Sequence, residues 1–188
     1  MSYRNDVIFP YRRIIVTGKG QITVDPDLAI IRLGVQTTAE DVTAAQSENA
    51  HISQMVLNSL KSLGITDIKT ITYRINKLVD FQDGRQIDRG YLVSNIYEIR
   101  MKDLTAVGTV IDTAVSNGAN VVNSVSFDVE NPDLYYQGAL NLAVDDAIQK
   151  AQSVSSGLNI MFNPVPILIT ENSTAPMPFQ PSFSLRED

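Results

Sequence analysis

The amino-acid sequence predicts an α+β protein with a mainly antiparallel sheet and helices on one face of it. Runs of alternating apolar residues separated by turn residues predict strands, and longer stretches with apolar residues at three- and four-residue steps predict helices. The predicted order is β-β-α-β-β-α-β-α-β. Residues 28–129 follow the βαββαβ pattern of a ferredoxin-like unit. We expect one domain because no linker-like segment divides the chain.

The first two strands are predicted to form a hairpin. Residues 13–24 are rich in β-branched side chains, residues 25–27 read Asp-Pro-Asp, and residues 28–37 alternate between apolar and other side chains. Gly18 and Gly20 interrupt the first strand, and glycines there indicate a bulge or the close approach of another backbone.

A helix is predicted over residues 40–63. Thr37 and Glu40 have the spacing of a capping box, and Gly64 is a suitable C-terminal cap. Its expected buried stripe consists of Val42, Ala45, Asn49, Ile52, Val56, Leu60 and Leu63.

A long antiparallel hairpin follows, with strands at residues 68–79 and 87–101 around a turn-rich segment at 80–85. Leu92 and Ile96 lie on the opposite face of the second strand from its main apolar row. Since helices are expected on one face only, both side chains should be exposed, and exposed apolar rows usually mean association. We therefore expect Leu92 and Ile96 to form an assembly face. The main row is Tyr91, Val93, Tyr97, Ile99 and Met101.

The second half of the chain continues the alternation of helices and strands. Asp103 is expected to cap a helix that ends at residues 117–118, Asn-Gly, and residues 121–129 form the next strand. A long helix begins after residues 131–133, Asn-Pro-Asp. Residues 165–170 form a short strand, and Pro164 and Pro166 indicate that it is an edge strand. The long helix should bury Tyr136, Leu140, Ala143, Ala147, Ala151, Val154 and Leu158.

Composition excludes several classes of chemistry. The 188 residues include no Cys and only one His, His51, so disulfides, thiolate nucleophiles, iron–sulfur clusters and multi-His metal sites within one chain are impossible. A formal charge of −6 argues against a nucleic-acid partner, because phosphate neutralisation needs clustered Lys and Arg. No apolar run is long enough for a transmembrane helix.

No motif defines an active site, so we expect a protein that is not an enzyme and binds no cofactor or metal. The Gly18-Lys19-Gly20 sequence lacks phosphate-loop spacing, and His51 has no Ser or Asp motif around it. Asp145 and Asp146 are interpreted as the solvated flank of a helix. The acidic turns at 25–27 and 80–88 lack EF-hand spacing, although the second leaves open a cation site.

Three segments together resemble the SIMPL-domain family. Val16 to Ala29 is similar to its V-x-G-x-G opening and P-D-x-A turn, and Gly90-Tyr91-Leu92-Val93-Ser94-Asn95 to its G-Y-x-A/V-S-N segment. Residues 103–120 resemble its D-L helix and G-A-N turn. The matching residues have structural interpretations: they bend the first strand, set its turn and bond backbone within the sheet. These residues are Gly18, Gly20, Pro26, Asp27, Gly90, Tyr91, Ser94 and Asn95.

The resemblance implies no catalytic residue, because none is established for the family. Bacterial members are described as periplasmic or outer-membrane-associated immunogenic proteins and as oxidative-stress-defence proteins. One member assembles into a large channel-like or ring-like homo-oligomer, and an animal relative binds an interleukin-receptor-associated kinase. Without Cys, any role in oxidative stress would be indirect, through binding or assembly.

The predicted organisation is an N-terminal extension at 1–12, a SIMPL-like domain at 13–171 and a Pro- and Phe-containing tail at 172–188. No apolar leader precedes the domain, which indicates the cytoplasm; the resemblance implies the periplasm or cell envelope if a leader is removed. The sequence leaves both open.

The leading hypothesis is a self-assembling, non-enzymatic protein that acts as a scaffold or a stress-related binding protein. Its expected partner is itself, with any further protein or small-molecule partner unknown. The alternative is a small-ligand or cation-binding module that uses the loop at 80–88 or a cavity between subunits.

Overall fold

The computed structural model describes residues 13–172 and has an α+β fold, which confirms the predicted class. Contacts within the chain divide the described residues into two compact units. Residues 25–130 form the unit that we call the sheet unit. Residues 13–24 together with 131–172 form the second, which we call the helix unit.

The sheet unit contains a four-stranded antiparallel sheet in the order β2-β3-β1-β4. This order and the βαββαβ sequence of elements are those of a ferredoxin-like unit, as the sequence predicts for residues 28–129. The strands are β1 (Leu28–Ala39), β2 (Ile68–Gln82), β3 (Arg85–Met101) and β4 (Val121–Asp128).

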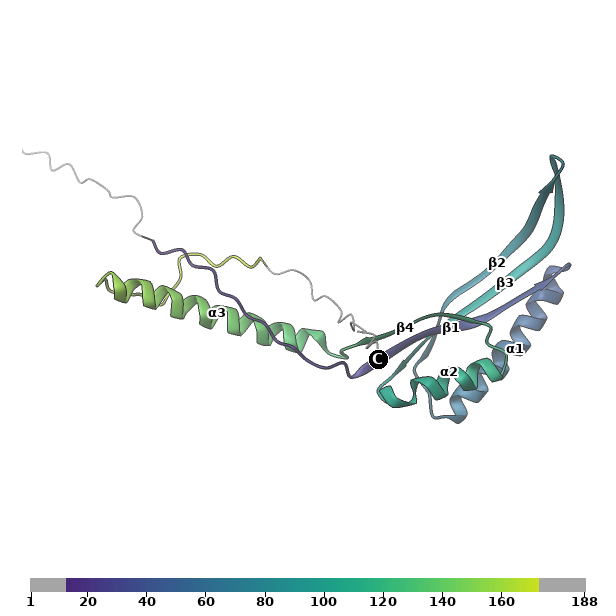
Figure 1. The fold of residues 1–188 in the computed structure, drawn as a ribbon, viewed down its shortest axis with the longest axis horizontal. Coiled ribbons are helices and arrows are strands. Elements are labelled where there is room, and N and C mark those ends of the chain that lie inside the picture. The colour runs from purple at the N-terminus through teal and green to yellow at the C-terminus, as the bar shows by residue number, and fades with distance from the viewer. Residues whose placement is uncertain (1–12, 173–188) are drawn as a thin grey trace, which may run out of the picture. The chain divides into compact units, whose positions relative to one another are not determined.

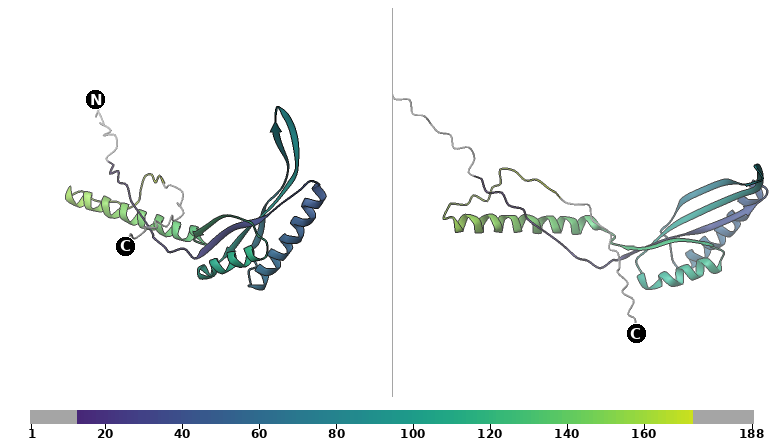
Figure 2. Two further views of the ribbon diagram at one scale, coloured as in Figure 1. Left: turned by 45° about the vertical axis from the view of Figure 1, so that its right-hand side comes forward. Right: turned by 45° about the horizontal axis from the view of Figure 1, so that its top comes forward.

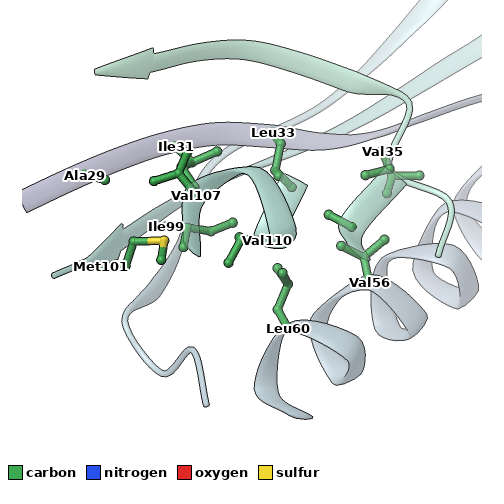
Figure 3. Close-up of a cluster of buried hydrophobic side chains, with 12 residues drawn as sticks. Ala29, Ile31, Leu33, Val35, Val56, Leu60, Ile99, Met101, Val107 and Val110 are labelled. Atoms are coloured by element: carbon green, nitrogen blue, oxygen red, sulfur yellow. The ribbon is translucent and has the colours of Figure 1, made fainter. Parts of the chain in front are cut away.

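Helices α1 (Val42–Ser62) and α2 (Val107–Ser116) cover the same face of this sheet and leave the other face open (Figures 1 and 2). A short 3₁₀ turn at Leu104–Ala106 leads into α2, and Asp103 caps it by accepting a hydrogen bond from the Thr105 N–H. Figure 3 shows the core between helices and sheet, where Val56 and Leu60 of α1 and Val110 of α2 meet the central strands. The strand residues of this core include Ala29, Ile31, Leu33, Val35, Ile99 and Met101.

The start of α1 differs from the predicted capping box at Thr37 and Glu40. Asp41 is the N-cap, and its carboxylate accepts hydrogen bonds from the N–H groups of Thr43 and Ala44. Thr37 is instead buried at the end of β1, where its hydroxyl donates to the Ala45 carbonyl. The capping box is wrong because the strand continues through Thr37 and the turn begins later.

The β2–β3 hairpin is confirmed, and both strands are longer than predicted. Asp83 and Gly84 form its two-residue turn with φ of 51° and 73°, a left-handed pair that Asp-Gly sequences adopt readily. The turn reduces the predicted loop at 80–85 to these two residues.

The helix unit is built on α3 (Pro132–Gly157), which begins with proline in its first turn as predicted. Residues 13–24 run beside α3 in an extended conformation, and the chain after the helix turns back along it (Figures 1 and 2). Tight turns at the end of α3 include a hydrogen bond from the Ile160 N–H to the Ser155 carbonyl.

The strands predicted at 13–24 and 165–170 are not formed in the structure. The predicted hairpin between 13–24 and 28–37 is excluded because β3 and β4 occupy both edges of β1. Residues 165–170 have strand-like composition but no neighbouring strand in the described chain. A β-strand needs a hydrogen-bonded partner, so composition alone does not produce one.

The buried face of α3 agrees with the predicted stripe only in part. Ala151 is buried as predicted and Ser155 is buried as well, whereas Leu140, Val154 and Leu158 of the stripe are exposed. The helix turns its small residues, rather than its large ones, toward the chain that lies on it.

No helix within residues 13–172 combines the length and apolar character needed to cross a bilayer. The proposed extension at 1–12 and all of the tail beyond residue 172 lie outside the described residues.

Candidate assembly surface

The glycines of the first motif allow a backbone to lie directly on α3. A Cβ atom added to Gly18 would be 1.8 Å from the Ala143 carbonyl oxygen, and one added to Gly20 would be 1.8 Å from that of Ala139. Real Cβ atoms do not approach a carbonyl so closely, so both positions require glycine. Of the two predicted interpretations, the close backbone approach is therefore confirmed.

The sequence predicted the helix side of this contact in part. Ala139, Ala143 and Ala147 face the glycines at four-residue spacing, and Ala151 continues the row into the buried part of the helix. Ala143, Ala147 and Ala151 belong to the expected buried stripe, whereas Ala139 does not. The match between this row of alanines and the Gly-x-Gly segment was not predicted.

A charged cluster fastens the extended segment to the helix. The Asp146 carboxylate accepts the backbone N–H of Lys19 at 2.7 Å and the Lys150 ammonium at 2.6 Å. Lys150 also donates to the Thr17 carbonyl at 3.0 Å. The Lys150 side chain first, and the Lys19 N–H second, hold the pKa of Asp146 below its usual range. Asp146 therefore bonds residues 13–24 to α3, and we call this contact the clamp; it is more than the solvated flank that the sequence predicted. Asp145 is exposed as expected.

The first half of the extended segment, residues 13–18, has the alternating exposure of a strand, and residues 19–23 are all exposed. Ile14, Val16 and Gly18 are half-buried, while Ile15 and Thr17 between them are exposed. Within the described chain, no main-chain hydrogen bond joins these residues to another backbone segment. The segment is therefore extended but has no hydrogen-bonded ladder.

Large apolar side chains of the helix unit are widely exposed. Ile167, Leu168 and Ile169 after the helix are 93%, 79% and 70% exposed. Monomeric proteins seldom expose contiguous apolar surface of this kind without a partner. The other exposed members from α3 onward are Leu134, Leu140, Leu142, Val144, Ile148, Val154, Leu158, Ile160, Met161 and Val165.

The assembly face predicted on β3 is less exposed than the sequence indicated. Ile96 is only 5% exposed and Leu92 is half-buried. Ile96 pairs with Gly34 of β1 and covers the space that a side chain there would fill, since its Cδ1 lies 2.7 Å from the Cβ position of Gly34. Its assumed exposure is wrong, because a side chain on an uncovered sheet face can be buried by its neighbours within the sheet.

The remainder of that open sheet face is largely polar. Arg32 and Glu98 form an ion pair at 2.9 Å, and the Gln36 amide donates to the Ser94 hydroxyl at 3.2 Å. Ser94, a motif residue, is buried in this arrangement. The open face of the sheet is therefore a weaker candidate for association than the helix unit.

Asn95 belongs to a polar cluster between α1 and the sheet. Its amide nitrogen donates to the Tyr97 hydroxyl at 2.6 Å and the Ser53 hydroxyl at 3.3 Å, not to backbone as predicted. Burial raises the pKa of Tyr97. Asn49, fully buried beside them, donates to the carbonyls of Val35 and Val93. These bonds fix α1 against β1 and β3.

The other motif residues shape turns. Gly90 has φ of 86°, and a Cβ there would be 2.2 Å from the Ala39 carbonyl oxygen. The Tyr91 ring, half-buried, has the Lys77 ammonium 6.0 Å from its centre. Asp27 joins the ends of the sheet unit by accepting the Glu130 N–H at 2.7 Å, and the half-buried Pro26 precedes it.

The acidic loop considered for a cation already has protein partners. Asp80 pairs with Arg89 at 3.2 Å and Asp88 with Lys77 at 2.6 Å, and these partners lower the pKa of each carboxyl group. Within residues 13–172, no group of three or more potential ligating side chains is placed to hold a metal ion.

His51 is exposed on α1, as expected for a surface histidine. A surface pocket of about 350 Å³ lies at the end of β3, lined in part by Asp67, Arg100, Lys102 and Asp103. Arg100 contacts Asp67 at 3.8 Å, Lys102 pairs with Glu130 at 2.7 Å, and Asp103 caps the following turn. The charged groups of this pocket thus serve the fold.

The chain is similar to bacterial proteins whose names give no activity. It is 31% identical over 173 residues to the 26 kDa periplasmic immunogenic protein of Brucella melitensis, covering 88% of this chain and 69% of the relative. It is 29% identical over 154 residues to the uncharacterized protein YggE of Escherichia coli K12, covering 81% of this chain. An YggE protein of Edwardsiella ictaluri is 24% identical over 155 residues, which are 81% of this chain and 65% of the relative.

The aligned part is 63% of the length of the Escherichia coli protein, less than two thirds of it. Residues 14–187 match the SIMPL family, described as a protein of unknown function (DUF541). This match spans nearly the whole chain and includes all three segments that carried the resemblance. The chain therefore belongs to the SIMPL family.

Proposed function

We propose that this chain is a non-enzymatic protein that assembles with copies of itself, and that the assembly serves as a scaffold or a stress-related binding protein. One observation carries the proposal: the helix unit exposes most of its large apolar side chains, and α3 buries only Ala151 and Ser155. The name of the Brucella relative supports placing the assembly in the periplasm.

Energetic arguments favour a partner for this surface. Burying a Leu, Ile or Val side chain stabilises a complex by about 1.5–3 kcal/mol. Leu140, Val144 and Ile148 follow one another at four-residue steps along one face of α3 and are all exposed, so covering them with protein would add several such contributions. Apolar area of this kind contributes most when it is continuous.

The choice of a second copy rests on features of the chain itself. Residues 13–24 carry Arg13 and Lys19 and no acidic residue, whereas residues 161–170 carry no charged residue. Both segments are exposed parts of the helix unit. One chain thus presents a basic segment, which repels its own copy, and an uncharged apolar segment, which does not, a combination suited to contact between copies.

Paired substitutions on the helix test the proposal. We expect Val144→Gln with Ile148→Gln to weaken association, and each lost apolar contact of about 1.5–3 kcal/mol corresponds to roughly a 10- to 150-fold higher Kd. The matched control is Met55→Gln with Val115→Gln, since both side chains are exposed on the helices of the sheet unit. Sedimentation velocity over a concentration series measures the effect.

Two results would count against the proposal. An unaltered chain that sediments as a single 20.7 kDa species at every concentration would remove self-assembly. Equal weakening by the helix pair and by the control pair would remove the assignment of the surface to α3.

A further inference from the structure

Residues 13–24 are extended but belong to no sheet. Exposure alternates from residue 13 to residue 18, and the two glycines hold the backbone against α3. The Lys19 N–H and the Thr17 carbonyl bond to side chains of α3, and within the described chain no other backbone pairs with this segment. Such an unpaired edge is a template for another strand.

Residues 165–170 have a strand-forming sequence but, like residues 13–24, belong to no sheet. Val165, Ile167, Leu168 and Ile169 are all at least 70% exposed. In an extended chain, Ile167 and Ile169 lie on one face and Leu168 on the other. Apolar side chains on both faces are typical of a strand covered from both sides.

From these two observations, and resting on the self-assembly proposed above, we infer that residues 165–170 of one copy pair as a β-strand with residues 13–24 of a second copy. The pairing supplies backbone hydrogen-bond partners to residues 13–24 and covers the exposed apolar side chains of residues 165–170. Arg13 and Lys19 disfavour pairing of residues 13–24 with the same segment of a second copy, whereas residues 165–170 carry no charge to oppose the pair.

The inference also sets the kind of assembly. Each copy provides residues 165–170 to one neighbour and receives the same residues of another neighbour on its own residues 13–24. A row of copies therefore keeps one unpaired segment of each kind at its two ends. Contacts of this head-to-tail kind close into rings or continue as filaments. A closed two-fold dimer would require the same segment on both sides of each contact.

The absence of Cys from the chain permits a clean cross-linking test. Full-length chains carrying Thr17→Cys or Gln21→Cys, exposed positions in the first segment, are mixed with chains carrying Ile167→Cys or Ile169→Cys. The two sets bear tags of different mass, and mild oxidation traps sulfurs whose Cβ atoms lie about 3.5–4.5 Å apart. Denaturing electrophoresis and mass spectrometry identify which chains are joined.

We expect disulfides between differently tagged chains for at least one of these four combinations, at about ten or more times the control yield because pairing raises the effective concentration of the two thiols. One control combines Ile167→Cys with Ser62→Cys, an exposed position at the end of α1. The other combines it with Ser124→Cys in β4, whose outer edge is the competing site for a strand.

Preferential linkage to Ser124→Cys would overturn the inference, as would linkage confined to one chain in a Thr17→Cys and Ile167→Cys double variant. Light scattering on the same unoxidised samples separates the two proposals. An oligomer without the mixed cross-link contradicts strand pairing alone. A monomer at every concentration contradicts both.

Discussion

Gly20 decides whether residues 13–24 can lie on α3, because any side chain there meets the helix backbone at Ala139. The opposing carbonyl oxygen belongs to a continuous helix and cannot move independently. The neighbouring clamp at Asp146 fixes the same segment by charge. Steric fit and charge therefore act on one contact, and each can be altered separately.

Replacing Gly20 with Ala should detach the segment from α3. Forcing extra atoms into a tightly packed contact typically costs about 1–3 kcal/mol, and we expect at least this loss in the free energy of unfolding. Hydrogen exchange followed by mass spectrometry should show lower protection at the Lys19 amide. Gly157→Ala is the control, since a Cβ there meets nothing within 4 Å, and it should leave both measurements nearly unchanged. Equal effects of the two substitutions would refute the steric account.

Asp146 should make the same contact sensitive to acid. Its pKa is lowered in the folded chain, so its contribution to stability is present above the ordinary Asp pKa of about 3.9. That contribution is lost as the pH falls through the lowered folded value. We expect exchange at the Lys19 amide to show this acid loss in the unaltered chain, after correction for the intrinsic pH dependence of exchange, and not in Asp146→Asn. The same pH profile in both would exclude the clamp.

At the scale of elements, the sheet unit follows from its sequence much more fully than the helix unit. Alternation at Ala29, Ile31, Leu33 and Val35 predicts which face of β1 is buried, because the core face is covered by α1 and α2 within the same unit. Positive φ at Gly64 and Gly118 likewise matches the predicted helix ends. Local pattern and tertiary packing agree wherever the covering partner belongs to the unit.

The helix unit was predicted less well because its partners are not given by local pattern. The predicted apolar stripe on α3 includes Ala143, which does lie against Gly18, but it also includes Leu140 and Val154, which are exposed. The β-branched run at 165–170 predicts a strand, but the ladder that would form it depends on a partner. Ile96 shows the opposite error, because it was predicted to be exposed and is buried. Gly34 on the neighbouring strand leaves room for its side chain, and the pattern of β3 alone does not reveal that room.

The sheet unit should therefore fold without the helix unit. Its apolar core, which includes Leu33, Val56, Ile99 and Val110, lies entirely within residues 25–130. We expect a chain of these residues to unfold in one cooperative transition, as small domains with their own core usually do. Circular dichroism during thermal unfolding measures it. A featureless melt with an unfolded spectrum would show that the core needs residues outside this range.

At the scale of the whole molecule, two properties of the chain act together. A formal charge of −6 on 188 residues favours solubility, while the apolar surface of the helix unit favours contact with another protein. With no Cys and a single His, the chain has neither thiol chemistry nor a multi-His metal site of its own, and the role proposed for it therefore depends on the apolar surface.

The mass of the full chain in solution tests the central claim, that copies assemble through the helix unit, most directly. Light scattering coupled to size-exclusion chromatography should give a multiple of 20.7 kDa for the full chain, while residues 25–130 alone elute as a monomer. Since association follows mass action, the measurement is repeated over a dilution series. A constant mass of 20.7 kDa for the full chain, or equal association of the isolated sheet unit, would contradict the claim.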